Sequence, residues 1–508
     1  METSIDSTNQ ASLPADPPSS RSVFRGIFTG SSVYALALLV PVMAGVLLSP
    51  ITTRCLTQDE FGLSELLTNV STVLSALFSV SLSGALGYFY FAAPDAAGRR
   101  RAVGTAVVGS TLLGIAGALI CWPFVPLLNQ KIFHGLDATG YLKVIVVMLP
   151  AGFLLDALFT WLRVENRSRA FVTGAVVRVA ITVVGILLFV KMLQLHVWGV
   201  LITSVSAILI VLLGLTIYWL RHMKPTVDRR LFASMARFSL PLTASSLGMF
   251  FLHFGDRFFL AFYWPLSEVA VYSIAYKIGM LMSTAFGAFA YYWGAQVFPI
   301  MRRPDADDVF RRVSTYLVLT TSFIGLGLIV FSPPVVRIMY RPEYWGAASL
   351  VPVIVLAYFC RSIGDFARAL FLVEGHPAYD TVCTFAGAGI CLGGYVFLIK
   401  TYNYWGAAIA TAIAFGSMMV ISLVWTHRVR PYSVDIRRLL KIGLSGGAAL
   451  ALHWLVPAGT VIPQIARATA SMAVFLSLLW ILHFPTSGEW ELACGAVLHV
   501  RAKLRPAK

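Results

Sequence analysis

The feature that most constrains this chain is a series of apolar runs, each about as long as a helix that crosses a lipid bilayer. A transmembrane helix needs about 20 mostly apolar residues, and the recurrence of such runs predicts an all-α polytopic membrane protein with about 14 transmembrane helices. The runs start near Gly30, Leu63, Ala102, Tyr141, Phe171, Val197, Phe238, Val269, Val313, Leu350, Tyr379, Trp405, Leu439 and Ile465.

Composition agrees with a membrane location and limits the kinds of activity. Of the 508 residues, 58% are hydrophobic and 12% are charged, whereas soluble domains carry about 25% charged residues. The six cysteines form no CxxC pair and have no histidine spaced for metal binding, and the chain has no P-loop, HExxH motif or nucleophile elbow. We therefore expect a protein that is not an enzyme and needs no metal or cofactor.

Basic residues collect in every second loop between the apolar runs. One set of loops holds Arg99 to Arg101, Arg163 to Arg169, Arg221 to Arg237, Arg302 to Arg312 and Arg428 to Lys441, and the alternate loops hold few. The positive-inside rule places the basic loops and both termini in the cytoplasm, which requires an even number of helices. Because the basic residues lie in short loops rather than on one soluble face, a nucleic-acid partner is not expected.

An internal repeat divides the chain. Residues 196–222 align with 403–429 without a gap, pairing Trp198 with Trp405 and Gly199 with Gly406. Two six-helix lobes in a parallel pseudo-twofold repeat are predicted, as in many transporters, with two extra C-terminal helices. The expected units are a disordered cytoplasmic tail (1–22), an N-terminal lobe (23–222), a cytoplasmic linker (223–237), a C-terminal lobe (238–429), two additional helices (430–485) and a basic cytoplasmic tail (486–508).

Four stretches resemble a known family. They are TRCLTQDEFGLSELLTNVSTVLSAL (53–77), GDRFFLAFYWPLSEVAVYSIAYKIG (255–279), FPIMRRP (298–304) and YRPEYWGAA (340–348). They are similar to segments of the polysaccharide flippases, often called Wzx-type, of the multidrug/oligosaccharidyl-lipid/polysaccharide (MOP) exporter superfamily. The resemblance covers roughly Gly26 to Val429.

The resemblance, rather than the composition, implies a substrate and a location. Such proteins carry a polyprenyl-pyrophosphate-linked oligosaccharide from the cytoplasmic to the outer leaflet of the bacterial inner membrane. The implied partners are this lipid-linked substrate, the bilayer itself and other polysaccharide assembly proteins.

Charged residues inside the apolar runs are the candidate functional residues, because a charge at bilayer depth is costly and usually has a partner or a task. The basic candidates for binding pyrophosphate or glycan are Arg257, Lys277, Arg361, Arg178 and Arg368. The candidates for charge balance or ion coupling are Asp256, Asp365 and Asp156.

Each candidate also has a structural interpretation. Asp256 and Arg257 form either a phosphate site with its own counter-charge or an ion pair between helices. Lys277 and Arg178 are either cleft residues or side chains that reach for the membrane interface. Arg361, Asp365 and Arg368 are spaced four and three apart, so they share a helical face and form either an ion-pair ladder or a second cationic site.

The hypothesis that joins these features is a transporter working by alternating access through a cationic central cleft. A coupling ion, Na⁺ or H⁺, is left open, as is the glycan. The rivals are a multidrug or cation antiporter of the same superfamily, an integral-membrane glycosyltransferase or polymerase, and a scaffold without transport activity. The aromatic cluster from Tyr88 to Phe91 is interpreted as an interfacial belt, with sugar stacking as the alternative.

Overall fold

The computed structural model describes residues 43–78, 82–133, 136–223 and 226–484. The predicted tails, 1–22 and 486–508, and the beginning of the first predicted helix lie outside these residues. Residues 43–55 are helical and are followed by a first group of elements. This group is α2 (Gln58–Phe78), α3 (Leu82–Ala92), α4 (Ala96–Cys121), η1 (Trp122–Phe124), α5 (Val125–Ile132), α6 (Thr139–Val164), α7 (Ser168–Gly185), η2 (Ile186–Met192) and α8 (His196–His222).

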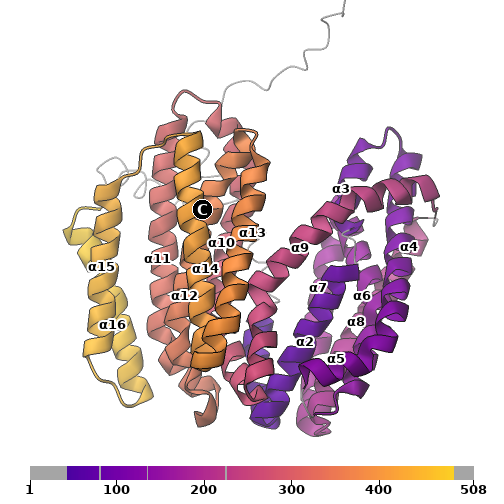
Figure 1. The fold of residues 1–508 in the computed structure, drawn as a ribbon, viewed down its shortest axis with the longest axis horizontal. Coiled ribbons are helices and arrows are strands. Elements are labelled where there is room, and N and C mark those ends of the chain that lie inside the picture. Colours follow the sequence, from indigo (N-terminus) through magenta and orange to yellow (C-terminus); the bar gives the residue numbers. More distant parts are fainter. Residues whose placement is uncertain (1–42, 79–81, 134–135, 224–225, 485–508) are drawn as a thin grey trace, which may run out of the picture.

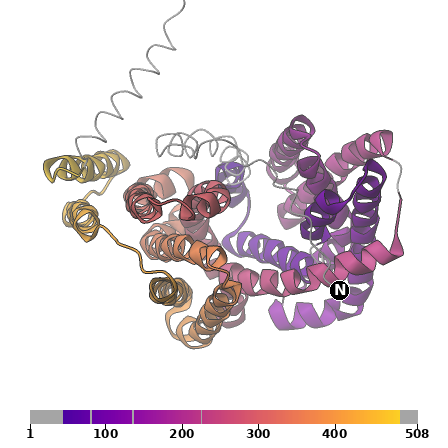
Figure 2. The same cartoon turned by 90° about the horizontal axis from the view of Figure 1, so that it is seen from above.

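The second group begins with a long helix that crosses from one lobe to the other (Figure 1). It is α9 (Arg229–Tyr263), and it is followed by α10 (Leu266–Met301), α11 (Ala306–Met339), η3 (Pro342–Tyr344), α12 (Ala347–Val373), α13 (Pro377–Gly394), η4 (Tyr395–Ile399) and α14 (Lys400–Val429). The additional helices α15 (Ile436–Leu455) and α16 (Val461–Ile481) pack on α11, at the side away from the first lobe (Figures 1 and 2).

The observed helices confirm the predicted fold class. Within the described residues, 10 helical stretches are long and apolar enough to cross a membrane. This number is below the predicted one because most of the first predicted helix lies outside the described residues, because α13 and α14 run together as one stretch, 378–429, and because α9 and α15 are not among the stretches that are apolar enough. Each of these two helices begins with basic residues, Arg229 and Arg230 in α9 and Arg437 and Arg438 in α15.

Two π-helical turns reveal the repeat in three dimensions. The helices α7 and α13 both have 18 residues, and each continues directly into a π-helical turn, η2 or η4. The helix that follows packs against each turn at a glycine. A Cβ on Gly199 would lie 2.9 Å from the Phe189 carbonyl oxygen, and one on Gly406 would lie 2.1 Å from that of Leu398. The same packing in both halves confirms the pseudo-twofold arrangement.

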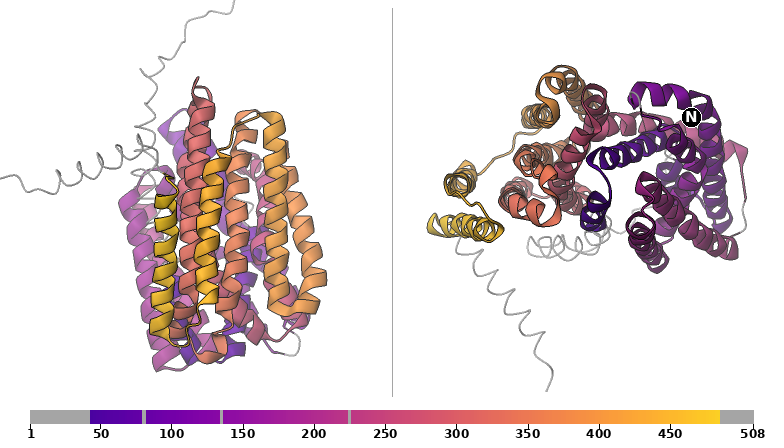
Figure 3. Two further views of the ribbon diagram at one scale, coloured as in Figure 1. Left: turned by 90° about the vertical axis from the view of Figure 1, so that its left-hand side faces the viewer. Right: turned by 90° about the horizontal axis from the view of Figure 1, so that it is seen from below.

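The hydrophobic cores explain how the two lobes are held. At the end of the bundle opposite the basic loops, one core joins residues of both lobes, including Phe61, Leu142, Tyr272 and Ala407. At the basic end each lobe has a core of its own, around Trp161 in the first lobe and around Phe310 in the second. The lobes therefore meet at the end opposite the basic loops and separate toward the basic end, as Figure 1 shows. Figure 3 gives the same bundle from the side of the second lobe and from below.

Replacing Gly406 by alanine tests the close packing of η4 on α14. We expect a lower midpoint of thermal unfolding, equivalent to about 1–3 kcal/mol, because the added methyl group overlaps the Leu398 carbonyl. Gly416→Ala is the matched control in the same helix, since its Cβ would have no neighbour within 4 Å. Tryptophan fluorescence of the purified protein in micelles gives the midpoints, and equal values for the two variants would contradict this packing.

Candidate substrate-binding site

The adjacent charges Asp256 and Arg257 lie in the C-terminal half of α9 and are almost completely buried, with 0% and 4% exposure. The guanidinium donates to the Asp256 carboxylate over 2.9 Å and to the backbone oxygen of His253 over 3.1 Å. Its carbon also lies 4.1 Å from the centre of the Tyr276 ring, a favourable cation–π position. Tyr272 donates a hydrogen bond to the second carboxylate oxygen. Both charges are thus satisfied inside the second lobe.

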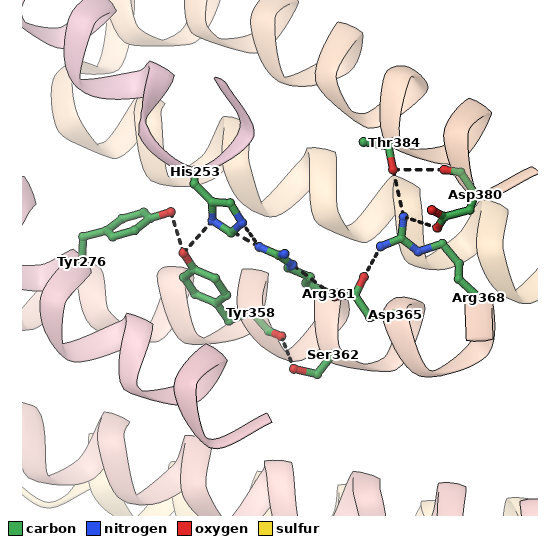
Figure 4. A network of polar contacts seen from close by, with 9 residues as sticks. All are labelled: His253, Tyr276, Tyr358, Arg361, Ser362, Asp365, Arg368, Asp380 and Thr384. Atoms are coloured by element: carbon green, nitrogen blue, oxygen red, sulfur yellow. Dashed lines mark hydrogen bonds and ion pairs between the residues drawn. The ribbon is translucent and has the colours of Figure 1, made fainter. Parts of the chain in front are cut away.

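Hydrogen bonds between tyrosine hydroxyls connect the surroundings of this ion pair to α12 (Figure 4). The Tyr358 hydroxyl donates to that of Tyr276 over 2.6 Å, and it lies 3.2 Å from Nδ1 of His253. The Arg361 guanidinium contacts the same imidazole. A guanidinium can only donate hydrogen bonds, so a hydrogen bond between these two groups requires the imidazole to accept.

The last part of the network joins α12 to α13. Nε of Arg361 lies 3.2 Å from one Asp365 oxygen, and Arg368 contacts the other. Arg368 also reaches Asp380 and the Thr384 hydroxyl of α13, each over 3.1 Å. The spacing of four and three residues in α12 thus produces the contacts that it predicts. We call this connected set of side chains the arginine network. Its members are His253, Asp256, Arg257, Tyr272, Tyr276, Tyr358, Arg361, Asp365, Arg368, Asp380 and Thr384.

Five of the eight candidate residues therefore belong to one network, and the other three lie elsewhere. Lys277 of α10 forms an ion pair of 2.6 Å with Glu65 of α2, which links the two lobes. Arg178 is exposed on α7, and Asp156 is exposed on α6. Both α6 and α7 are first-lobe helices, whereas the network lies on helices of the second lobe and on α9. The functional roles assigned to all eight residues stay predictions.

Three members of the arginine network had no signal strong enough to single them out. His253 and Tyr358 lie in apolar runs whose composition is typical of a hydrophobic core. Asp380 comes directly after the predicted start of a helix. One local signal was available for His253, because it precedes Arg257 by four residues and so faces the same side of α9.

The charges of the arginine network balance. Three arginines face three aspartates, Asp256, Asp365 and Asp380, and each aspartate has an arginine within 3.2 Å or less. Without ligand the arginines are thus held by internal counter-charges, which offsets the cost of keeping them out of water. A phosphate group would have to compete with these carboxylates for the same donors, and its fit to the planar guanidinium fork makes such competition chemically reasonable.

A cavity of about 540 Å³ lies at the basic end, between α3 and α9. It is lined by Tyr88, Phe89, Ala233, Ser234, Arg237 and Phe238. The rings of Tyr88 and Phe238 are stacked with centroids 4.9 Å apart, and Tyr88 is 59% exposed. An exposed aromatic pair beside an arginine can contact both a sugar face and a phosphate.

Comparison with known proteins identifies the family of this chain. The model of the polysaccharide biosynthesis protein family matches residues 27–303. The chain belongs to this family. An uncharacterized membrane protein of Methanocaldococcus jannaschii is 19% identical in an alignment over 367 residues that covers 66% of this chain and 70% of that protein.

Solved transporters share the fold. A structure described as the lipid II flippase MurJ in an inward closed conformation has a TM-score of 0.71 at 14% identity, covering 89% of this chain and 98% of that one. An inward-facing multidrug resistance transporter of the MATE family within the MOP superfamily has a TM-score of 0.59 at 16% identity, with 81% and 94% covered. A MOP superfamily transporter from Pyrococcus furiosus has a TM-score of 0.56 at 16% identity, with 82% and 98% covered. The chain therefore shares the fold of these solved transporters.

Removing one partner of the buried ion pair tests its energetics. Arg257→Leu leaves the Asp256 carboxylate without its guanidinium partner, so we expect a loss of about 3–5 kcal/mol in stability. The double variant Asp256→Leu/Arg257→Leu should lose clearly less, because no charge is then stranded. Arg311→Leu is the control, since its pair with Asp308 is exposed and is worth about 1 kcal/mol or less. Thermal unfolding in micelles measures all three, and a double variant as unstable as Arg257→Leu would refute the pairing.

Proposed function

We propose that this protein is a flippase that moves a polyprenyl-pyrophosphate-linked oligosaccharide from the cytoplasmic to the outer leaflet of a bacterial inner membrane. The observation that carries the proposal is the arginine network. Three arginines lie within the helices of a polysaccharide biosynthesis family member, where the cost of burying charge argues for a task. Pyrophosphate is the anion that such a substrate would present to them.

The proposed orientation follows from the basic loops. With these loops in the cytoplasm, the shared core lies toward the outer leaflet, and the lobes are separated on the cytoplasmic side. This arrangement supports an inward-facing state that receives substrate from the cytoplasmic leaflet. The aromatic cavity with Arg237 lies on that side, where it offers a first contact for sugar and phosphate.

Alternating access requires the contacts at the outer end to open. Besides the shared core, several polar contacts cross between the lobes there. The helical segment 43–55 supplies three of them: Ser49 contacts the Tyr340 hydroxyl, Arg54 donates to the Ile338 backbone oxygen, and Arg341 donates to the Arg54 backbone oxygen. Others come from the beginning of α2 and from Lys277. The Asp59 carboxylate accepts a hydrogen bond from the Ser267 backbone N–H over 2.8 Å, and Gln58 donates to the backbone oxygen of Glu343 over 3.0 Å. Lys277 forms its ion pair with Glu65. Their rupture, together with movement of α9, would let the lobes rock to an outward-facing state. Among the described residues, α9 packs on α3 and α4 of one lobe and on α13 and α14 of the other.

The energy source is part of the proposal. The membrane potential, worth about 2.3 kcal/mol per charge per 100 mV, acts on an anionic substrate and on the arginines, and a coupling ion, Na⁺ or H⁺, is the other candidate. The multidrug antiporter is less well supported, although solved relatives of the fold transport drugs. A cationic drug needs a carboxylate to pair with, and each aspartate of the arginine network is already paired with an arginine.

Deleting the gene and complementing it with Arg361→Gln tests the function. Deletion should make lipid-linked oligosaccharide accumulate in the cytoplasmic leaflet, and only the wild-type gene should restore its transfer. Arg361 is the residue of choice because Asp365 keeps Arg368 as its partner, so the variant strands no carboxylate. Arg257→Ala should also abolish transfer, but it carries the stability loss described above.

The control for this experiment is Arg311→Gln, which removes an exposed cation near the basic end and should complement fully. Immunoblots must show equal amounts of all variants in the membrane. Full activity of Arg361→Gln would defeat the role of the arginine network. A deletion strain that shows no accumulation, but is hypersensitive to cationic dyes, would assign the protein to the drug antiporters instead.

Reversing the charges of the lobe-bridging ion pair tests the outer contacts. Lys277→Glu places two carboxylates opposite each other at the position where Nζ and Oε1 now lie 2.6 Å apart. We expect transfer to fall in Lys277→Glu and in Glu65→Lys and to recover in the double reversal, because opposite charges again face each other. Complementation of the deletion strain measures all three. A double variant no better than the singles would show that the pair does not hold the outer end closed.

A further inference from the structure

A second cavity, of about 590 Å³, lies at the end of the bundle opposite the basic loops, between the second lobe and the additional helices α15 and α16. Arg337 of α11, Arg467 of α16 and His453 of α15 line it, together with Trp345, Trp405 and Trp454. None of these residues belongs to the arginine network, and the cavity lies on the side of the second lobe away from the first lobe. Its chemistry is therefore separate from that of the proposed transport route.

The two arginines of this cavity are not neutralised by any described residue. Arg337 donates to the backbone oxygen of Gly459 and lies over the Trp345 ring, and Arg467 donates to the backbone oxygen of Val456 over 2.7 Å. Neither forms an ion pair in the part of the chain that the structure describes, although both line the same cavity. This contrasts with the arginine network, where every guanidinium contacts a carboxylate.

Buried polar groups at this cavity also lack partners. Nε of Arg467 and Nδ1 of His453 are both buried and have no hydrogen-bond partner among the described residues. The His453 side chain is only 4% exposed, so bulk water does not readily supply one. A buried donor left without a partner costs about 1–3 kcal/mol. Two uncompensated cations and the unpartnered Nε–H of Arg467 at one cavity call for an anion.

We propose that this cavity binds the phosphate group of an anionic phospholipid in the outer leaflet. A phosphate oxygen suits the free Nε–H of Arg467 and the charge of Arg337. The surrounding surface favours a lipid over free phosphate, because the residues beside the cavity are exposed and apolar, among them Leu455 and Ile462 at 80% each and Trp454 at 67%. Tryptophans at this level also match the preference of indole for the membrane interface. The leaflet follows from the orientation proposed above, whereas the site itself does not depend on it.

Such a lipid would hold the additional helices to the second lobe. The headgroup would contact α11, α15 and α16 together, which are otherwise joined by a small core around Leu326, Ala449 and Phe475. The lipid thus serves as a structural ligand rather than as cargo.

Native mass spectrometry of the full-length protein tests the proposal. The protein is titrated in detergent with phosphatidylglycerol, with phosphatidylcholine of the same acyl chains, and with inorganic phosphate as a competitor. Wild type should bind one phosphatidylglycerol tightly, and Arg467→Gln and Arg337→Gln should each weaken it about tenfold, the scale of one charge-assisted hydrogen bond. Arg467→Lys, which keeps the charge but removes the Nε donor, should lie between them.

Arg341→Gln is the matched control, because Arg341 lies at the same end of the bundle but pairs with Glu343 outside the cavity. It should bind phosphatidylglycerol like the wild type. Size-exclusion profiles and thermal midpoints identify any variant that fails to fold, and the Lys variant then carries the comparison. Equal binding by Arg467→Gln and Arg341→Gln, or equal affinity for the two lipids, would overturn the site. Displacement of the lipid by inorganic phosphate at the same concentration would overturn the lipid as its source.

Discussion

The cost of keeping charge away from water organises the second lobe of this protein. Arg257, Arg361 and Arg368 lie within its helices, and each is held by a carboxylate, a ring face or a backbone oxygen. The helices α9, α10, α12 and α13 supply these partners, so their relative positions are fixed by the need to satisfy the guanidinium groups. In the proposed flippase, the same requirement would let a phosphate group take the place of a carboxylate, because both anions accept hydrogen bonds from the guanidinium fork.

The fold was largely predictable because it depends on properties that are local in sequence. Bilayer-length apolar runs, the side preference of arginine and the match of Trp198 and Gly199 with Trp405 and Gly406 each report on one helix at a time. The ladder in α12 was predictable for the same reason, since Arg361, Asp365 and Arg368 lie three and four residues apart in one helix.

The remaining parts of the site depend on how helices pack on each other, which a single sequence does not encode visibly. Nothing next to Arg361 identifies His253 as its neighbour, because that contact joins residues 108 positions apart. For the same reason the partner of Lys277 proved to be Glu65 in the other lobe, and Arg178 and Asp156 were found on exposed helix faces. A single charged residue in an apolar run indicates that a partner or a polar surrounding is needed, but it does not show which helix supplies it.

The two π-helical turns, η2 and η4, bear on how the chain arose. A π-helical turn is rare and occurs mostly as a short interruption of an α-helix, so finding one at a given place by chance is uncommon. Here the two turns stand directly after equally long helices in the two halves, and each packs on a glycine of the helix that follows. A six-helix unit that already contained the turn, copied when the gene duplicated, accounts for both turns, whereas separate origins would have to produce the same rare feature twice at the same place.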